Sequence, residues 1–86
     1  MKSNELKIEK LEVSRIWVND YMFIQVEPHE NNYCEFFLCH SKFTSRLSLF
    51  GSCMPKIENE DMMIELAAMG YNEKRFEYMD MLEEET

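Results

Sequence analysis

Residues 21–40 read YMFIQVEPHENNYCEFFLCH, two runs of β-type residues on either side of a short polar segment. Met22, Ile24 and Val26 occupy alternate positions of the first run, the period of two that is typical of a strand. Pro28 is expected to end this strand, and PHENN (28–32) to form a loop. Since NYCEFFLC (32–39) predicts a second strand, the two runs are expected to be neighbours in an antiparallel sheet.

The β character extends outward in both directions from this pair. LEVSRIWV (11–18) is rich in β-branched and aromatic residues and precedes Asn19-Asp20, a plausible two-residue turn. On the other side, HSKFTS (40–45) predicts a polar connection and RLSLF (46–50) alternates again. Leu6 and Ile8 can begin an earlier strand. We therefore expect an antiparallel meander of three to four strands within a β-rich segment, 6–50.

After Gly51 the apolar period changes from two to about 3.6, which predicts helix. Asn59 is placed to cap a first helix, and Gly70 to end it in the left-handed conformation. Asn72 can then cap a second helix that runs to about Glu84. The expected fold is α+β: a single domain, 1–86, in which two C-terminal helices (58–84) pack on one face of the sheet.

Composition limits the class of protein. A chain of 86 residues has room for one core, and its 45% hydrophobic and 13% aromatic content argues against disorder. MKSNELKIEK (1–10) lacks the apolar region of a secretory signal, and no apolar run could span a bilayer. Three cysteines do not suggest a disulfide framework. These features predict a cytoplasmic protein with reduced thiols.

The net charge of −8 is confined to the last third of the chain. Residues 1–57 carry seven acids and seven bases, whereas residues 58–86 carry ten acids and only Lys74 and Arg75 as bases. Such a segment repels nucleic acid and anionic membranes, and it attracts basic surfaces. Direct binding of nucleic acid or membrane is therefore not expected.

Two histidines and two cysteines fall within thirteen residues, which raises the possibility of a zinc site: His29, Cys34, Cys39 and His40. A zinc site requires ligands that converge within about 2.0–2.3 Å of one ion. On a strand, Cys34 and Cys39 point to opposite faces, and Cys34 and His40 are roughly 20 Å apart. We expect no metal here. Cys53 could join such a site only if residues 34–40 curl instead of forming a strand.

The sequence also lacks the parts of a catalytic site. Cys39 and His40 are adjacent in sequence but diverge on a strand, and no acid is placed to orient either of them. With only Gly51 and Gly70, the chain has no glycine-rich phosphate loop. We therefore expect neither enzyme activity nor a cofactor.

The acids of the helical segment form stripes. On a helical wheel, Glu73, Glu77, Asp80 and Glu84 make one row at roughly 5–6 Å intervals along the axis. A shorter row on the first helix contains Glu58, Asp61 and Glu65. A solvated face is one interpretation. The other is that the rows imitate the phosphates of a nucleic-acid strand and bind a basic protein groove.

The second helix is also apolar over a broad side that one sheet face cannot cover completely. This side contains Phe76, Tyr78, Met79, Met81 and Leu82. Methionine side chains suit adaptable binding surfaces as well as cores. Tyr78 and Met81 are therefore predicted to contact a partner together with the two acidic rows.

Residues 64–82, IELAAMGYNEKRFEYMDML, resemble the first two helices of a ubiquitin-associated domain. The resemblance implies that Met69, Gly70 and Tyr71 form the loop between these helices, which in that family contacts ubiquitin. It covers about a fifth of the chain. The family's third helix has no counterpart here, and Phe76 is bulky where the family packs small residues. We interpret the match as coincidental, because a glycine C-cap followed by a hydrophobic residue is common between helices.

These observations predict a small non-catalytic, acidic protein-binding module. In size and charge it is similar to the inhibitors that phages and mobile elements use against host nucleic-acid enzymes, including anti-CRISPR proteins. It would block a basic nucleic-acid-binding surface of a host protein. The alternative is a structural or homodimerising subunit with an apolar interface of Tyr78, Met79 and Met81. A third hypothesis, an enzyme or metal protein centred on Cys34, Cys39 and His40, has less support.

Overall fold

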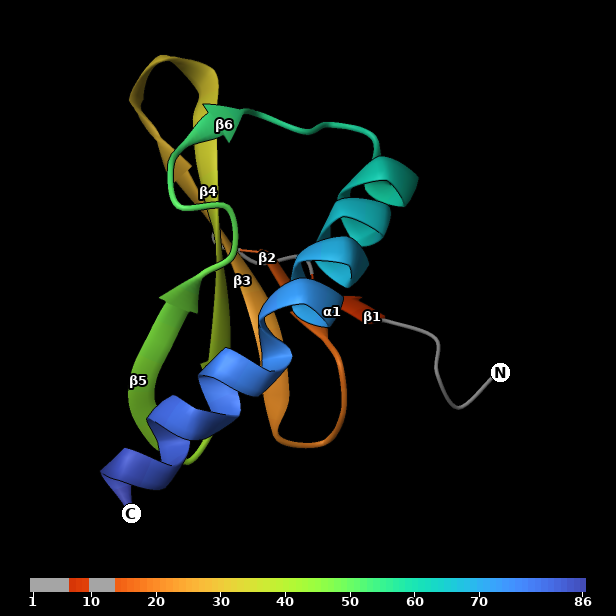
Figure 1. Ribbon diagram of the computed structural model, residues 1–86. Helices are drawn as coiled ribbons and strands as arrows, with labels where there is room; N and C mark the ends of the chain where they lie inside the picture. The colour runs from red at the N-terminus through yellow and green to blue at the C-terminus, as the bar shows by residue number, and fades with distance from the viewer. Residues whose placement is uncertain (1–6, 10–13) are drawn as a thin grey trace.

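A computed structural model describes residues 7–9 and 14–86 and confirms the α+β class. An antiparallel sheet is followed by one long C-terminal helix that lies across one of its faces (Figure 1). In chain order the elements are β1 (Lys7–Glu9), β2 (Ser14–Trp17), β3 (Met22–His29), the 3-10 helix η1 (Glu30–Asn32), β4 (Tyr33–His40), β5 (Phe43–Ser48), β6 (Met54–Pro55) and α1 (Glu60–Glu85).

The sheet is a meander of sequential neighbours in the order β1-β2-β3-β4-β5, and the short β6 pairs with the beginning of β4. Its centre is the β3–β4 hairpin, in register from Met22 opposite His40 to His29 opposite Tyr33. The predicted strand pair in 21–40 is therefore confirmed. Leu6 and residues 10–13 lie outside the described part of the chain.

Two predicted strand boundaries are wrong. Pro28 lies inside β3 and pairs with Cys34. Pro28 lies near the end of β3, beyond the pairing of β3 with the described part of β2, and strand ends tolerate the missing N–H of a proline. The predicted connection 40–45 is shortened to Ser41-Lys42, because β4 reaches His40 and β5 starts at Phe43.

The turn between β2 and β3 contains the predicted Asn19 but is longer than the predicted two-residue turn. It spans residues 18–21, and the Asn19 side-chain oxygen accepts hydrogen bonds from the backbone N–H groups of Tyr21 and Met22, both at 2.8 Å. This is the local backbone mimicry that makes asparagine common in turns.

The core lies between the sheet and α1 and follows the alternation of the strands. From the sheet it takes Ile16, Met22, Ile24, Val26, Cys34, Phe36 and Leu38. Leu49 joins it from the segment after β5, and Ala67 and Tyr78 from α1. The opposite face of the sheet carries Phe23 and Cys39, which are also buried. On that face the Arg46 guanidinium lies 3.9 Å from the Phe37 ring centre and donates to Glu27.

The prediction of two helices is wrong, because α1 continues through Gly70 and Asn72. Gly70 is buried and does not adopt a positive φ. A Cβ atom at this position would lie 2.9 Å from Cδ1 and 3.0 Å from Cβ of Leu49. Gly70 therefore does not end the helix. It allows the helix to approach Leu49 closely. The resemblance to a ubiquitin-associated domain fails for the same reason, since residues 69–71 form helix where that family has a loop.

In the described residues, no helix combines the length and apolar character needed to cross a membrane.

Candidate protein-binding surface

Both ends of α1 are fixed by side-chain hydrogen bonds. At the start, the Asn59 side-chain oxygen accepts from the Met62 N–H at 3.0 Å, and Glu60 and Asp61 occupy the first turn, where the helix dipole favours acids. At the end, the Glu85 carboxylate accepts from the Thr44 N–H and hydroxyl at 2.8 and 2.7 Å, and from the Ser45 N–H at 3.1 Å. The Asn59 cap therefore defines the start of the helix, and the Glu85 contacts attach its C-terminal end to β5.

These hydrogen bonds also control the titration of Glu85. Donors from Thr44 and Ser45 stabilise its charged form and lower its pKa from 4.5 to about 2. The carboxylate therefore stays ionised, and the helix end stays attached to β5, throughout the neutral range.

Tyr78 belongs to the inner face of α1, so its predicted role as a partner contact is wrong. Its side chain is 0% exposed, and its hydroxyl donates to the Ser45 carbonyl oxygen at 2.6 Å. Burial raises the pKa of the phenol. Met81 is half-buried and packs against the core with Leu82, so only part of its side chain is accessible to a partner. The sheet and the segment after it cover more of the helix than its composition suggested.

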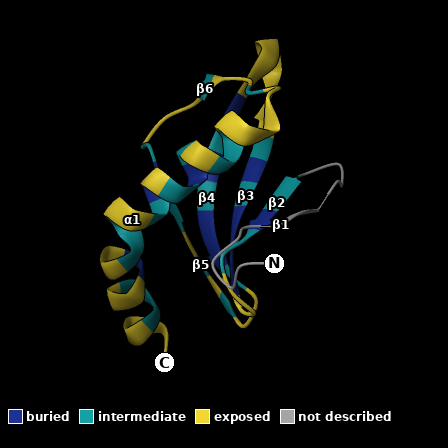
Figure 2. Ribbon diagram, turned by 90° about the vertical axis from the view of Figure 1, so that its right-hand side faces the viewer, coloured by how far each residue is buried: buried dark blue, intermediate teal, exposed yellow. Residues whose placement is uncertain are grey.

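The predicted acidic residues are all exposed. Those within α1 are Asp61, Glu65, Glu73, Glu77, Asp80 and Glu84. Glu58 is exposed as well but precedes the helix. Among them, Glu77 approaches a base, with its Oε1 3.6 Å from the Lys74 Nζ. Such an exposed pair contributes little to stability. The rows are therefore open to solvent, and exposed segments recur along the length of α1 (Figure 2).

An apolar stripe lies beside these rows, and the sequence predicted it only in part, through Phe76 and Met79 on the incompletely covered side of the second helix. Met62, Met69 and Phe76 are 52, 57 and 65% exposed, and Met79 is 41% exposed. The first three are seven residues apart, so successive members lie about 20° apart around the helix and form one outward line. The Arg75 guanidinium lies 4.8 Å from the Phe76 ring centre. The heptad spacing was visible in the sequence, but the assumption of a break at Gly70 concealed it.

The stripe and the rows together form one surface, which we call the outer face of α1. With 3.6 residues per turn, Glu73, Glu77, Asp80 and Glu84 lie on one side of the apolar line. Asp61 and Glu65 lie on the other side, near the start of the helix, and Glu83 continues the apolar line seven residues after Phe76. An apolar centre with a charged border is the usual anatomy of a protein-binding patch.

The sequence cluster of cysteines and histidines does not converge. Cys34 is in the core beneath α1, whereas Cys39 is buried on the opposite sheet face, where desolvation raises its pKa to about 11. His40 accepts a hydrogen bond from the Lys42 N–H at its Nδ1 (3.0 Å) and stacks on Tyr21. His29 lies elsewhere, near Cys53. These placements agree with the alternation predicted for residues 33–40.

Comparison with protein-family models, curated proteins and solved structures finds no match to this chain.

Proposed function

We propose that this protein is a small non-catalytic binding module whose outer α1 face docks on a basic surface of a nucleic-acid-binding protein and blocks it. The observation that carries the proposal is the exposed line of Met62, Met69 and Phe76, which has an acidic row on one side at the start of the helix and on the other side in its second half. Because α1 packs on the core through Ala67 and Tyr78 and Glu85 attaches its C-terminal end to β5, little ordering of this surface would oppose binding.

The apolar line supports a protein partner in particular. Exposed Phe and Met side chains on one face are enriched where proteins bind other proteins. A partner that offers only charge would leave these side chains in water. The matching surface therefore has an apolar centre flanked by lysines and arginines.

The charge of the helix supports a basic partner. Residues 58–86 hold the entire net charge of −8, and the carboxylates of the two rows face solvent. Rows at roughly 5–6 Å intervals are comparable in scale to the charges along a nucleic-acid strand. A groove that binds nucleic acid would accept them and would lose its own ligand. The module would therefore inhibit its partner by displacing nucleic acid from the groove.

The test is capture of partners from nuclease-treated lysate of the native host with four tagged proteins: the parent, two variants of the outer face and a control variant. The first is the parent. The second carries Glu73→Gln, Glu77→Gln, Asp80→Asn and Glu84→Gln. The third carries Met69→Ser with Phe76→Ser. A control variant, Asp20→Asn with Glu30→Gln, removes exposed acids away from the helix.

A basic nucleic-acid-binding protein that is retained by the parent and the control, and lost by the other two, would support the proposal. A partner that all four proteins retain would move the binding site away from α1.

The second candidate is a homodimer, and the seven-residue spacing of Met62, Met69 and Phe76 favours it, because such spacing is common where helices pair. Two copies would, however, bring acidic rows together and repel each other. Sedimentation at micromolar concentration separates the two: a strict monomer excludes the dimer.

A further inference from the structure

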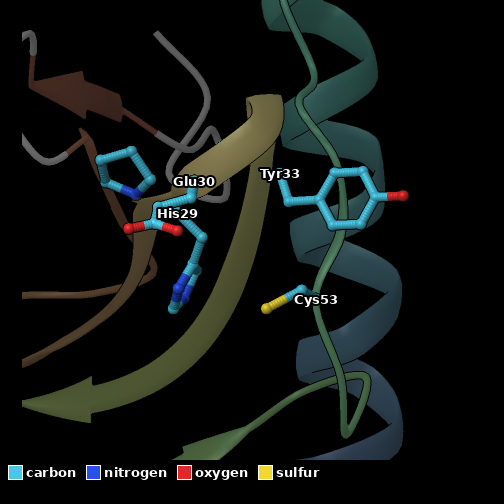
Figure 3. A pocket seen from close by; sticks show the side chains of 5 residues that line it. His29, Glu30, Tyr33 and Cys53 are labelled. Carbon is cyan, nitrogen blue, oxygen red and sulfur yellow. The ribbon is translucent and has the colours of Figure 1, made fainter.

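A second cluster of chemically active side chains lies at the far end of the β3–β4 hairpin. His29 ends β3, Glu35 belongs to β4, and Cys53 lies in the segment between β5 and β6. One nitrogen, one carboxylate oxygen and one sulfur from these residues all lie within 4.8 Å of one another. Figure 3 shows the His29 ring and the Cys53 sulfur turned toward each other.

The distances fit a single ion between the three atoms. The His29 Nε2 lies 3.2 Å from the Glu35 Oε1, and the Cys53 Sγ lies 3.9 Å from the same oxygen. In a tetrahedral zinc site, bonds of about 2.0–2.3 Å place neighbouring ligand atoms roughly 3.3–3.6 Å apart. The His29 and Cys53 ligand atoms lie within 4.8 Å of each other, so a movement of up to about 1 Å by the exposed cysteine would complete that geometry.

The carboxylate is oriented for this role by other residues. The Ser48 hydroxyl donates to the Glu35 Oε2 at 3.0 Å, and the Gly51 N–H donates to the Ser48 oxygen at 3.2 Å. The second carboxylate oxygen is thereby occupied, which leaves Oε1 directed at His29 and Cys53. Hydrogen-bonded partners of this kind are usual behind metal ligands.

The site is open on its outer side. His29 and Cys53 are exposed, and Glu35 is half-buried. A surface pocket beside them is lined by Pro28, His29, Glu30, Tyr33 and Cys53 (Figure 3). Three protein ligands therefore leave a fourth position accessible to water or to a side chain of a partner.

We propose that His29, Glu35 and Cys53 form a binding site for one divalent transition-metal ion, with zinc as the best match. Nitrogen, oxygen and sulfur donors together suit a borderline-soft ion and disfavour magnesium and calcium, which take oxygen ligands. The ion would join the end of β3, the first part of β4 and the segment after β5, and would reinforce the side-chain contacts of Glu35 with His29, Ser48 and Cys53.

The experiment is a titration of the reduced, chelator-treated full chain with Co²⁺, followed by displacement with Zn²⁺. A thiolate–cobalt charge-transfer band and the intense visible bands of tetrahedral cobalt are expected at one equivalent. Binding should release protons, because the thiol must lose one to become a ligand. Cys53→Ser should abolish the charge-transfer band.

Variants with one change each locate the site. His29→Gln and Glu35→Gln should weaken binding strongly, whereas Ser48→Ala should weaken it about 10–100-fold, the effect typical of an outer hydrogen-bond partner. His40→Gln is the matched control and should bind as the parent does. Cys34→Ala with Cys39→Ala, which leaves Cys53 as the single thiol, should keep the band.

Two results would overturn the site. One is the absence of a charge-transfer band in the folded parent at millimolar Co²⁺. The other is a band that survives in Cys53→Ser, since it would assign the sulfur ligand to Cys34 or Cys39. Circular dichroism on each variant separates lost ligation from lost folding.

Discussion

Gly70 lies so close to Leu49 that a Cβ atom on the glycine would be 2.9 Å from the leucine Cδ1 and 3.0 Å from its Cβ. Leu49 is itself buried, 2% exposed, and Phe50 approaches the same point at 3.2 Å. The close approach seats the middle of α1 on the segment after β5. It also determines which side of the helix faces outward.

Gly70→Ala is expected to destabilise the protein by about 1–3 kcal/mol through overpacking, even though alanine gains up to about 1 kcal/mol of helix propensity. Leu49→Ala alone should cost about 2–5 kcal/mol. The double variant should lose clearly less than the sum, because removing the leucine side chain makes room for the new methyl group. Urea unfolding of the four proteins measures this coupling. Additive losses would contradict the contact.

Tyr78→Phe should lower the free energy of unfolding by roughly 1–2 kcal/mol, because the Ser45 carbonyl loses its hydrogen-bond donor in a part-buried contact. For a domain of this size the thermal midpoint would fall by about 4–15 °C. Tyr33→Phe is the control, since Tyr33 is about half exposed, and its change should stay within about 0.5 kcal/mol. Equal midpoints for the two variants would show that the hydrogen bond from Tyr78 to Ser45 contributes nothing to stability.

The attachment of Glu85 to β5 should be sensitive to acid. The folded-state pKa of Glu85 is about 2, below its ordinary value of 4.5, so its contribution to stability is fully present above pH 4.5. It is lost as the pH falls from 4.5 toward 2. Glu85→Gln should show a smaller fall in thermal midpoint across that interval than the parent. Parallel curves for the two proteins would mean that the carboxylate does not hold the helix end in solution.

Replacing the exposed apolar line should leave the fold intact. Met69→Ser with Phe76→Ser changes residues that are mostly in solvent, so the expected change in unfolding free energy is within about 0.5 kcal/mol per site. Thermal unfolding checks this expectation. Losses of 2 kcal/mol or more would show that the line is covered by the protein itself, and the outer face would then not be free for a partner.

The sequence predicted the fold class and the sheet face of most β3 and β4 residues, because alternation in 21–40 is strong and both strands are central. It also predicted Asn59 as the cap of the helix. The helix break was wrong because Gly70 has two uses, ending a helix or permitting close packing, and only the tertiary position of Leu49 distinguishes them.

The candidate sites were predictable to different degrees. The acidic rows follow from spacing alone, and the structure places all of them in solvent. The burial of Tyr78 could not be predicted, because its hydroxyl meets the carbonyl of Ser45, 33 residues earlier in the chain. The cluster of His29, Glu35 and Cys53 was equally hidden, because the loop after β5 must fold back beside β4 to bring Cys53 to the hairpin.

The most direct test of the central claim is competition on a captured partner. Binding of the parent to that partner would be measured by fluorescence anisotropy at increasing salt and with increasing single- or double-stranded oligonucleotide. The outer-face account predicts affinity that falls steeply with salt and full displacement by nucleic acid. A salt-independent affinity, or a ternary complex in which the partner holds both ligands, would contradict it.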